Sequence, residues 1–472
     1  MKGRGGWLGA MTSARLEPRL LKTPVMFLNR LRCSPSEPVP AGHARWPTFL
    51  VTAALILTRP EVLRAEDRVD YRYEDYAEDN GRMQIQTHTA YVEAELTSRV
   101  AVKGQFVYDA ISGATPTGGP AAAGDPQVPL LAPGILKDIR RAGSIITDLR
   151  YGAEPDGKHG RFVTSPQIAF SRENDYESIG VALNQTVNFN QRNTAITLGV
   201  AHNFDRVRGF FQPDFVDKDT TDALLGFRQI LSPRTVLTAN LTFGYAHGYL
   251  SDPYKGVNFT YSYPISFWDP VAIGVNDAER RPDKRFRQVL FLELQHYVDR
   301  LRGALQVNWR GHHDDWGILA STAEITWHQK FGRRGRDMDP WFTLSPFFRF
   351  HHQTAADFYA VRFVGDPGYP GGAQAGAQSD GFTILFSDDP AFPGDATSIL
   401  TVPAYPSAYS SDYRLSRLNT FSFGLSLEAR LHDRFSLYGG YKRYVMEGLD
   451  GVTSDSAYPT AHVVTVGATL WF

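Results

Sequence analysis

Cysteine is almost absent from this chain, which has one, Cys33, in 472 residues. Cys33 precedes the cleavage site predicted below, so the mature chain would have no cysteine for disulfides, and no Cys-x-x-Cys-His motif for covalent haem is present. The four residues before Cys33, Asn-Arg-Leu-Arg, also lack the small side chains of a lipoprotein cleavage site. The sequence therefore argues against a disulfide scaffold, a c-type cytochrome and a lipid anchor.

An excess of charge of one sign is also missing. Lysine and arginine together number 49, aspartate and glutamate 50, and the formal net charge is -1. This balance gives no basic region of the kind that binds nucleic acid. Aromatic residues are plentiful at 13%, although the mean hydropathy is only -0.29. A barrel in a membrane combines aromatic girdles and an apolar outside with a polar inside and wet loops, and so fits both numbers.

Long hydrophobic runs are absent too. The one continuous apolar run, from Phe49 to Leu57, is far shorter than the roughly 18 residues that a spanning helix needs. It has the size of the apolar core of a signal peptide, and basic residues precede it at Arg30, Arg32 and Arg45. The alternative is that this run forms a buried strand.

A cleavage site follows the apolar run. Ala65 supplies the small residue at the cut and leaves Glu66 as the mature start. The basic region before the apolar run is unusually long, so translation could begin at Met11 or Met26. We therefore expect residues 1–65 to be a signal peptide and residues 66–472 to form the folded protein.

A period of two dominates the sequence after Glu66. The clearest example runs from Thr420 to Leu431, where an apolar face alternates with a polar one. The apolar face consists of Phe421, Phe423, Leu425, Leu427, Ala429 and Leu431. Many such segments reach ten residues or more, close to the roughly 9–11 that cross a bilayer at a tilt. Strands that long, with one apolar face, predict membrane-spanning β-strands.

The connections between these segments differ in length. Short turns are predicted at 97–98, 191–192, 232–234, 299–300 and 432–433, and long polar stretches at 112–137, 248–283 and 354–413. Outer-membrane barrels show this asymmetry, with short periplasmic turns and longer outer loops. The predicted strands are 67–78, 82–96, 99–111, 138–152, 161–173, 176–189, 193–205, 219–231, 234–247, 285–298, 301–313, 315–329, 340–353, 414–430, 434–446 and 460–472. The expected fold is all-β, an antiparallel transmembrane β-barrel of about sixteen strands in the Gram-negative outer membrane.

The chain ends on an alternating apolar face that stops at an aromatic residue. This face consists of Val464, Val466, Ala468, Leu470 and Phe472. Such an ending resembles the signal that outer-membrane proteins present to their barrel-assembly machinery. The final strand must close the sheet, so its edge is available for recognition by strand addition before closure. Outer-membrane lipid and this machinery are the expected partners.

Several stretches resemble a family known as domain of unknown function 3570. They are Leu96 to Ser98, Val107 to Pro116, Ser171 to Ser178 and Gly448 to Pro459 followed by the terminal strand. The resemblance spans the mature chain and implies an outer-membrane barrel. It carries no reaction or catalytic residues. Members are thought to accompany flavin-transfer or thioredoxin-like proteins, which implies a redox partner at the surface or in the periplasm.

Charged residues at inward positions are the candidate lumen lining. They are Glu93, Glu95, Lys103, Asp148, Arg150, Arg228, Glu293, Arg302, Arg310, Glu324, Arg349, Glu428, Arg430 and Lys442. Such residues either orient a polar solute in a pore or cross-link the wall by salt bridges. The sequence leaves both interpretations open, and the balance of signs predicts no ion selectivity.

Histidines and aspartates gather at one predicted turn, which holds His312, His313, Asp314 and Asp315. Imidazole and carboxylate ligands suit a transition metal, but consecutive side chains on a strand diverge. A solvated outer turn without metal is therefore the expectation, and no cofactor is predicted.

The expected function is a porin-like channel or transport barrel for small polar solutes. Sixteen strands are enough to leave an aqueous passage unless loops fill it. One alternative is a closed barrel that acts as a structural sheath or docking scaffold for a redox or surface partner. A second is a hydrolase at the rim, although no spacing of serine, histidine and carboxylate identifies a nucleophile with its base. We expect the protein not to be an enzyme.

Overall fold

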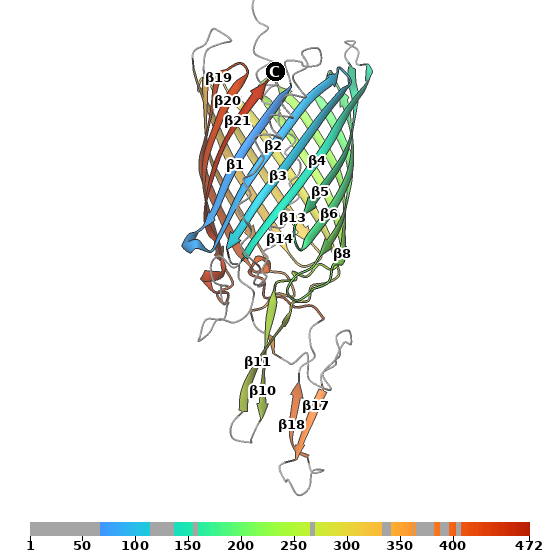
Figure 1. The fold of residues 1–472 in the computed structure, drawn as a ribbon, viewed down its shortest axis with the longest axis vertical. Helices are drawn as coiled ribbons and strands as arrows, with labels where there is room; N and C mark the ends of the chain where they lie inside the picture. The colour runs from blue at the N-terminus through green and yellow to red at the C-terminus, as the bar shows by residue number, and fades with distance from the viewer. Residues whose placement is uncertain are drawn as a thin grey trace, which may run out of the picture.

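A computed structural model of the chain describes residues 67–113, 136–153, 159–264, 270–332, 341–361, 363–364, 382–387, 396–402 and 407–472 (Figure 1). The predicted signal peptide and its cleavage site lie outside the described residues, so both stay predictions. No helix among the described residues is long and apolar enough to cross a membrane.

Sixteen antiparallel strands form one closed barrel, as predicted. In ring order they are β1 (Arg68–Glu78), β2 (Met83–Thr97), β3 (Val100–Gly113), β4 (Leu136–Ala153), β5 (His159–Arg172), β6 (Tyr176–Phe189), β7 (Thr194–Val207), β8 (Val216–Ser232), β9 (Thr235–Gly248), β12 (Lys284–Val298), β13 (Gly303–Asp314), β14 (Leu319–Phe331), β15 (Trp341–Gln353), β19 (Leu418–His432), β20 (Phe435–Gly448) and β21 (Thr460–Trp471). Each of the sixteen predicted strands overlaps one of these.

The first and last strands close the ring. β1 pairs with β21 from Arg68 opposite Trp471 to Glu78 opposite Ala461. The backbone N–H of Phe472 donates to the carbonyl of Asp67 at 3.0 Å, which extends the ladder beyond both strands. A closed ring has no free edge, so the barrel backbone is hydrogen-bonded all the way round, as a lipid environment requires.

The two faces of the wall differ as the period of two predicts. Phe423, Leu425 and Leu427 of β19 are 50%, 45% and 43% exposed, whereas Ser422, which precedes them on the other face, is buried. Exposed leucine, isoleucine, valine and phenylalanine side chains recur on most of the barrel strands. Such an apolar outer surface is stable against lipid and not against water.

Connections at the two ends of the barrel differ in length. The C-terminus lies at the end with the short turns, such as those at 190–193 and 433–434 (Figure 1). The opposite end, called the loop end below, bears the connections 208–215, 249–283, 354–417 and 449–459. Three connections at the loop end are short, at 79–82, 173–175 and 315–318. The predicted asymmetry therefore holds for most connections.

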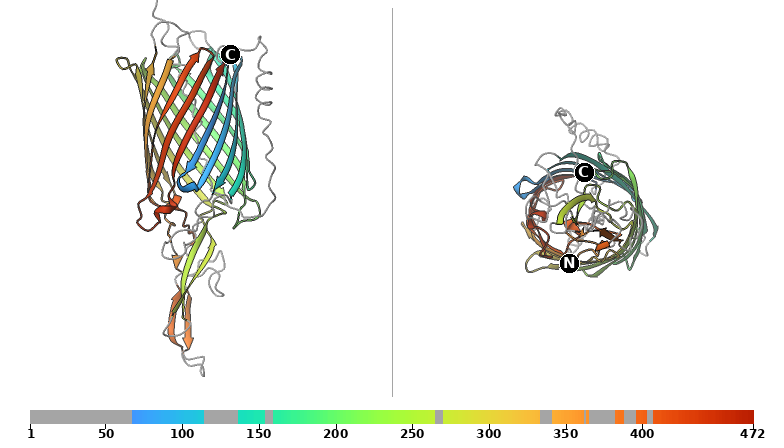
Figure 2. Two further views of the ribbon diagram at one scale, coloured as in Figure 1. Left: turned by 60° about the vertical axis from the view of Figure 1, so that its left-hand side comes forward. Right: turned by 90° about the horizontal axis from the view of Figure 1, so that it is seen from below.

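The long connections at the loop end contain strands that the sequence analysis did not predict. β10 (Gly256–Pro264) and β11 (Pro270–Ala278) form a hairpin, and β16 (Phe363–Val364) pairs with β10. β17 (Phe382–Ser387) and β18 (Ala396–Val402) form a second hairpin. Both hairpins project beyond the barrel wall (Figures 1 and 2). The sequence analysis missed these strands because none of them shows an alternating pattern of membrane-spanning length. They form by pairing with neighbouring segments of the chain.

Three 3-10 turns lie between barrel strands at the loop end: η1 (Asp79–Gly81), η2 (Tyr413–Leu415) and η3 (Asp455–Ala457). η2 explains one boundary error. The strand predicted from residue 414 starts at Leu418, because Asp412 accepts a hydrogen bond from the Arg414 N–H and begins the turn instead. Likewise the strand predicted from 315 starts at Leu319, because Asp314 accepts hydrogen bonds from the backbone of Trp316 and Ile318.

Candidate functional site

The predicted lumen residues lie on barrel strands and alternate with the exposed apolar side chains, with one exception. Arg302 lies in the turn between β12 and β13, at a φ of 52°, and its guanidinium donates to the carbonyl of Gly332 at 2.9 Å. The sequence pattern misplaced it because the turn is longer than predicted and β13 starts at Gly303.

Ion pairs cross-link the lumen side near the short-turn end. The Lys103 ammonium lies 2.7 Å from Asp148 and 3.8 Å from Glu93, which also receives Arg68 at 3.2 Å. These residues come from β1 to β4, so the pairs connect four successive strands. For Glu93, Lys103 and Asp148 the structure therefore favours the wall-bracing interpretation.

Three further candidates also brace the wall. The Arg150 guanidinium lies 2.7 Å from Glu95, again between β4 and β2. Arg430 of β19 lies over the Trp471 ring at 3.5 Å and donates to the carbonyl of His432 at 3.1 Å. Arg430 therefore braces the turn between β19 and β20.

The middle of the barrel, and the part of β8 toward the short turns, hold charges that are less constrained. Arg228 of β8 and Arg349 of β15 are exposed, although both lie on the inward face of the wall. Arg310 of β13 lies over the Phe291 ring at 5.7 Å and within electrostatic reach of Arg349 and Glu324. The interior is therefore accessible to solvent at these two arginines.

Carboxylates of the middle region bind amides. Glu293 accepts hydrogen bonds from the side chains of Gln306 at 2.6 Å and Gln295 at 3.1 Å. Glu324 accepts one from Asn308 at 3.3 Å. The remaining two candidates, Glu428 of β19 and Lys442 of β20, are half-buried on the same wall.

Opposite this charged wall, β6 to β9 present small and polar side chains. Gly180, Gly199 and Gly226 lie at inward positions on β6, β7 and β8. The hydroxyls of Thr186 and Thr197 hydrogen-bond across the first two of these strands at 2.8 Å. Asparagine side chains fill the interior beside these glycines, because their Oδ1 atoms lie within 3.0 Å of where a Cβ on each glycine would stand.

Loops at the opposite end from the C-terminus pack together into a structure we call the loop cap, residues 249–257, 279–283, 354–361 and 407–417. The Tyr254 hydroxyl donates to Asp175, just before β6, and Asp252 binds Arg414, just before β19, at 2.6 Å. β6 is the sixth and β19 the fourteenth of the sixteen strands, so they stand eight places apart, on opposite sides of the ring. The loop cap therefore spans the mouth, as the axial view in Figure 2 also shows.

Buried charges hold the loop cap together. Arg281 lies 2.7 Å from Glu279 and 2.8 Å from Asp412, and the side chains of all three are at most 4% exposed. Arg414 binds Asp412 through Nε at 2.9 Å and also reaches Asp252. The network joins the loop after β9 to the loop before β19. The opposite charges in the network compensate one another. An isolated buried charge would cost too much desolvation free energy.

Burial and neighbouring charges shift the pKa values in this network. Burial by itself would raise the pKa of Asp412, but the charges of Arg414, Lys255 and Arg281 hold it well below 3.8. Burial lowers the pKa of Lys255 to about 8, although nearby carboxylates oppose the shift. The Lys255 ammonium also lies 5.5 Å from the Tyr413 ring centroid.

An apolar cluster completes the loop cap. Trp316, Ile318, Ala356 and Leu415 are buried together, and Phe358 packs edge-on against Trp316 with ring centroids 5.2 Å apart. These residues come from the β13–β14 turn and from both ends of the connection between β15 and β19. The loop cap thus has a small hydrophobic core of its own.

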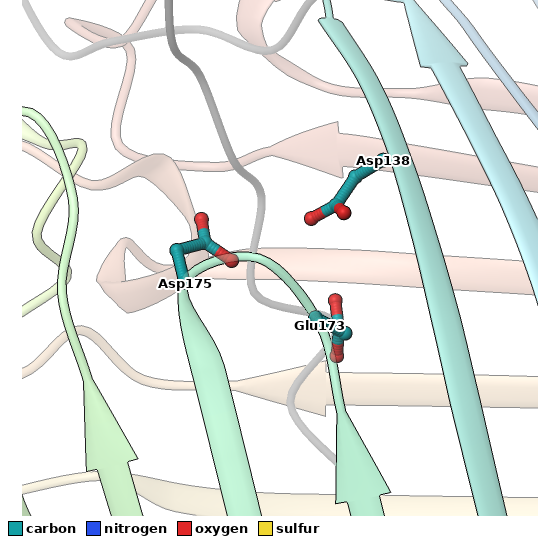
Figure 3. Close-up of side chains that lie close together, drawn as sticks. All are labelled: Asp138, Glu173 and Asp175. Atoms are coloured by element: carbon teal, nitrogen blue, oxygen red, sulfur yellow. The ribbon is translucent and has the colours of Figure 1, made fainter. Parts of the chain in front are cut away.

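Three carboxylates meet beside the loop cap. Asp138, Glu173 and Asp175 offer oxygen atoms that lie within 4.8 Å of one another (Figure 3). Asp138 also accepts a hydrogen bond from the Asn174 side chain at 2.9 Å, and Asp175 accepts one from Tyr254. Oxygen ligands of this kind suit a hard cation such as Ca²⁺. The arrangement also serves to anchor the loop cap to the β5–β6 turn.

The predicted histidine and aspartate turn does not form a shared site. His312 Nε2 lies 3.2 Å from Asp314, but His313 is exposed on the opposite face, and Asp315 accepts the backbone N–H of Phe286 at 2.9 Å. The expectation of a solvated turn is wrong for Asp314, which is 1% exposed and binds Arg285. Two backbone N–H groups and a guanidinium compensate its burial.

The apolar face at the C-terminus lies on the outside of β21. Val464, Val466 and Leu470 are exposed, and Ala468 and Phe472 are half-buried. All of β21 pairs with β1 and β20 in the finished barrel. Their role as an assembly signal is not visible in a closed ring and stays a prediction.

Sequence reasoning missed the loop cap. Its residues lie in the long polar stretches, where no periodicity marks burial. One feature of the sequence could have indicated burial. The segment from Ser410 to Ser416 contains more Asp, Arg, Tyr and Ser than is usual for a mobile loop. Only the contact between two loops, 131 residues apart at Arg281 and Asp412, shows that these charges are buried.

Comparison with solved structures finds outer-membrane barrels of low similarity. A bacterial polysaccharide outer membrane secretin matches at 9% identity and a TM-score of 0.41, over 87% of this chain and 99% of that one. OccK2 (OpdF) from Pseudomonas aeruginosa, in complex with glucuronate, matches at 8% and 0.35, over 86% and 96%. The outer membrane protein opdK from Pseudomonas aeruginosa matches at 8% and 0.36, over 86% and 98%.

No curated protein sequence matches the chain. The family described as Protein of unknown function (DUF3570) matches residues 47–455, which is most of the chain and includes all but the last barrel strand. The matched range agrees with the resemblance found in the sequence. The chain belongs to the DUF3570 family.

Proposed function

We propose that this protein is a channel for small polar solutes in the outer membrane of a Gram-negative bacterium, with its outer entrance narrowed by the loop cap. The location rests on the physics of the wall. A closed antiparallel ring with an apolar outside needs lipid around it, and single-chain barrels of this form belong to that membrane.

One observation carries the channel: Arg228 and Arg349 point inward and are nevertheless exposed. An arginine inside a filled barrel would be shielded and paired, as the half-buried Arg150 is with Glu95. Exposure of these two inward side chains means that water reaches the interior at both, and water-filled barrels of sixteen strands conduct polar solutes.

Conductance across a planar bilayer tests this proposal. Purified, refolded protein should give steady currents, and Arg349→Glu should shift the reversal potential in a salt gradient toward cation preference. Arg300→Glu, in a short turn outside the lumen, is the matched control and should leave the reversal potential unchanged. Absence of currents from both wild type and variants in which the loop cap is loosened would contradict the proposal.

The loop cap supports a second candidate, a barrel closed at its outer end that acts as a docking scaffold for a surface or redox partner. Buried ion pairs across the mouth make spontaneous opening costly. Conductance separates the two: if the wild type is silent and Asp412→Asn conducts, the cap closes the barrel at rest. Silence of both, with a partner that co-purifies, supports the scaffold.

A further inference from the structure

Two histidines and an aspartate meet on the outer surface of the barrel near the loop end. His202, Asp219 and His247 belong to the adjacent strands β7, β8 and β9. They share the outward face with Phe204 and Tyr245, two residues along the same strands, which are 54% and 40% exposed. The group therefore lies on the lipid side of the wall, at the margin of the apolar surface nearest the loop end.

Strand pairing fixes the positions of the three residues. Asp219 is the direct partner of His247 on β9 and of Phe204 on β7, so His202 lies diagonally across from it. His202 Nε2 lies 3.7 Å from Asp219 Oδ1, and His247 Nε2 lies 3.9 Å from Asp219 Oδ2. Both imidazoles thus direct the same nitrogen at one carboxylate, from its two sides.

A hydrogen bond orients one of the rings. His202 Nδ1 lies 2.8 Å from the Thr221 hydroxyl, which is on the next turn of the pleat in β8. The Phe204 ring packs edge-on against the imidazole with centroids 4.3 Å apart. Metal-binding histidines commonly have a hydrogen-bond partner on one ring nitrogen, which orients the ring so that the other nitrogen can bind the metal.

We propose that His202, Asp219 and His247 bind one divalent transition metal ion, with Zn²⁺ as the representative. Two imidazoles and a carboxylate are a ligand set that zinc takes, with water or a lipid phosphate completing the shell. Tetrahedral ligands at about 2.0–2.1 Å from zinc stand about 3.4 Å apart, so the two N–O distances of 3.7 and 3.9 Å need to shorten only slightly. The ligand atoms of the three residues do not all lie within 4.8 Å of one another, so the two imidazoles must also move toward each other on binding. The residues are not yet closed around a common point, and side-chain exposures of 30%, 30% and 50% leave them free to turn inward.

The alternative is that the three residues form only two surface ion pairs, which contribute little to stability. Lys284 bears on the choice, because it is the partner of His247 on β12 and is exposed on the same face. The Lys284 ammonium is a nearby counter-charge for Asp219, and it repels a second cation such as the metal ion. Lys284→Gln should therefore tighten metal binding, whereas a structural role for the group gives no such effect.

Calorimetric titration of Zn²⁺ into the purified, detergent-solubilised protein tests the site. One equivalent should bind to the wild type, and the binding should be lost in His247→Ala and in Asp219→Asn. Thr221→Val should weaken it by about tenfold. His352→Ala, another outward histidine, and Asp175→Asn, in the carboxylate group of Figure 3, are controls and should bind as the wild type does.

Two results would overturn the proposal: no binding to the wild type, or one equivalent retained by both His247→Ala and Asp219→Asn. Unheated gel mobility should be the same for all variants, which shows that each is folded. The visible spectrum of bound Co²⁺ supplies a second readout, since nitrogen ligation gives intense tetrahedral bands that His202→Ala should remove. Neither measurement depends on whether the barrel conducts.

Discussion

Asp412 is the residue that joins the two arginines of the loop cap, Arg281 and Arg414. Its carboxylate binds Arg281 from one loop and Arg414 from its own turn, and its side chain is completely buried. Removing one member of such a network leaves the others buried without compensation, which is more costly than losing the same contact at a surface. The strength of the loop cap is therefore concentrated in a few side chains.

Asp412→Asn should destabilise the docked loop cap by about 3–5 kcal/mol, because each of two buried arginines loses one of its two counter-charges while the shape of the side chain is kept. Trp316 reports docking, since it packs on Phe358 of the loop cap. A single-tryptophan variant that keeps Trp316 should show its fluorescence transition at lower urea in Asp412→Asn. Asp433→Asn, in a short turn at the other end, should leave that transition unchanged. Equal shifts in both variants would contradict the role given to Asp412.

Lys255 makes the loop cap respond to alkaline pH. Its pKa is about 8 when docked, against 10.5 ordinarily, so between these values the undocked state binds more protons. Docking stability should then rise with pH, by about 2 kcal/mol from pH 8 to pH 10. The same fluorescence transition measured across this range tests the sign. Lys255→Met should flatten the rise, and a stability that falls over this range in the wild type would refute the assignment.

At the scale of elements, the terminal strand has two separable roles. In the folded barrel β21 closes the ring against β1, and Phe472 adds a single backbone hydrogen bond beyond the last pair. Before closure the edge of β21 is free and available for strand addition. A residue that matters for recognition but little for the finished structure should affect assembly and not stability.

Deletion of Phe472 should therefore reduce the amount of assembled barrel in cells several-fold, while the purified variant refolds in detergent as well as the wild type does. Membrane fractionation measures the first quantity and heat-dependent gel mobility the second. Thr469→Ser, on the inward face of the same strand, is the control. Loss of refolding in detergent together with loss of assembly would show that Phe472 acts through stability alone.

Closure of the ring belongs to the whole molecule. β1 is bonded to β2 on one side and to β21 on the other, although Arg72 and its partner on β21, Gly467, stand 395 positions apart in the chain. Without β1 the ring has two unpaired edges, which lipid cannot satisfy.

Removal of residues 67–82 should abolish the compact, heat-sensitive form of the protein on unheated gels. Removal of residues 382–402, which contribute no barrel strand, should leave it intact. If the chain without β1 keeps the compact mobility, the ring is not closed by the β1–β21 pair.

The membrane strands could be predicted from the sequence because each one must show its own alternation. β19 has Phe423, Leu425 and Leu427 on the lipid side whatever its neighbours are, so the pattern survives without tertiary knowledge. Boundaries at the loop end were less accurate, since η2 and the Asp314 turn depend on local hydrogen bonds that periodicity does not reveal. The lumen face followed from the same alternation, with the exception of Arg302 in its turn.

The sequence alone thus determined the barrel, its strand number and which face of each strand meets lipid, because lipid imposes a local rule on every spanning residue. Only the tertiary structure decided which lumen charges are paired, that two loops cross the mouth, and that His202, Asp219 and His247 meet. These features depend on register and on contacts between distant segments. The partner of a charged side chain cannot be predicted from the sequence of its own strand.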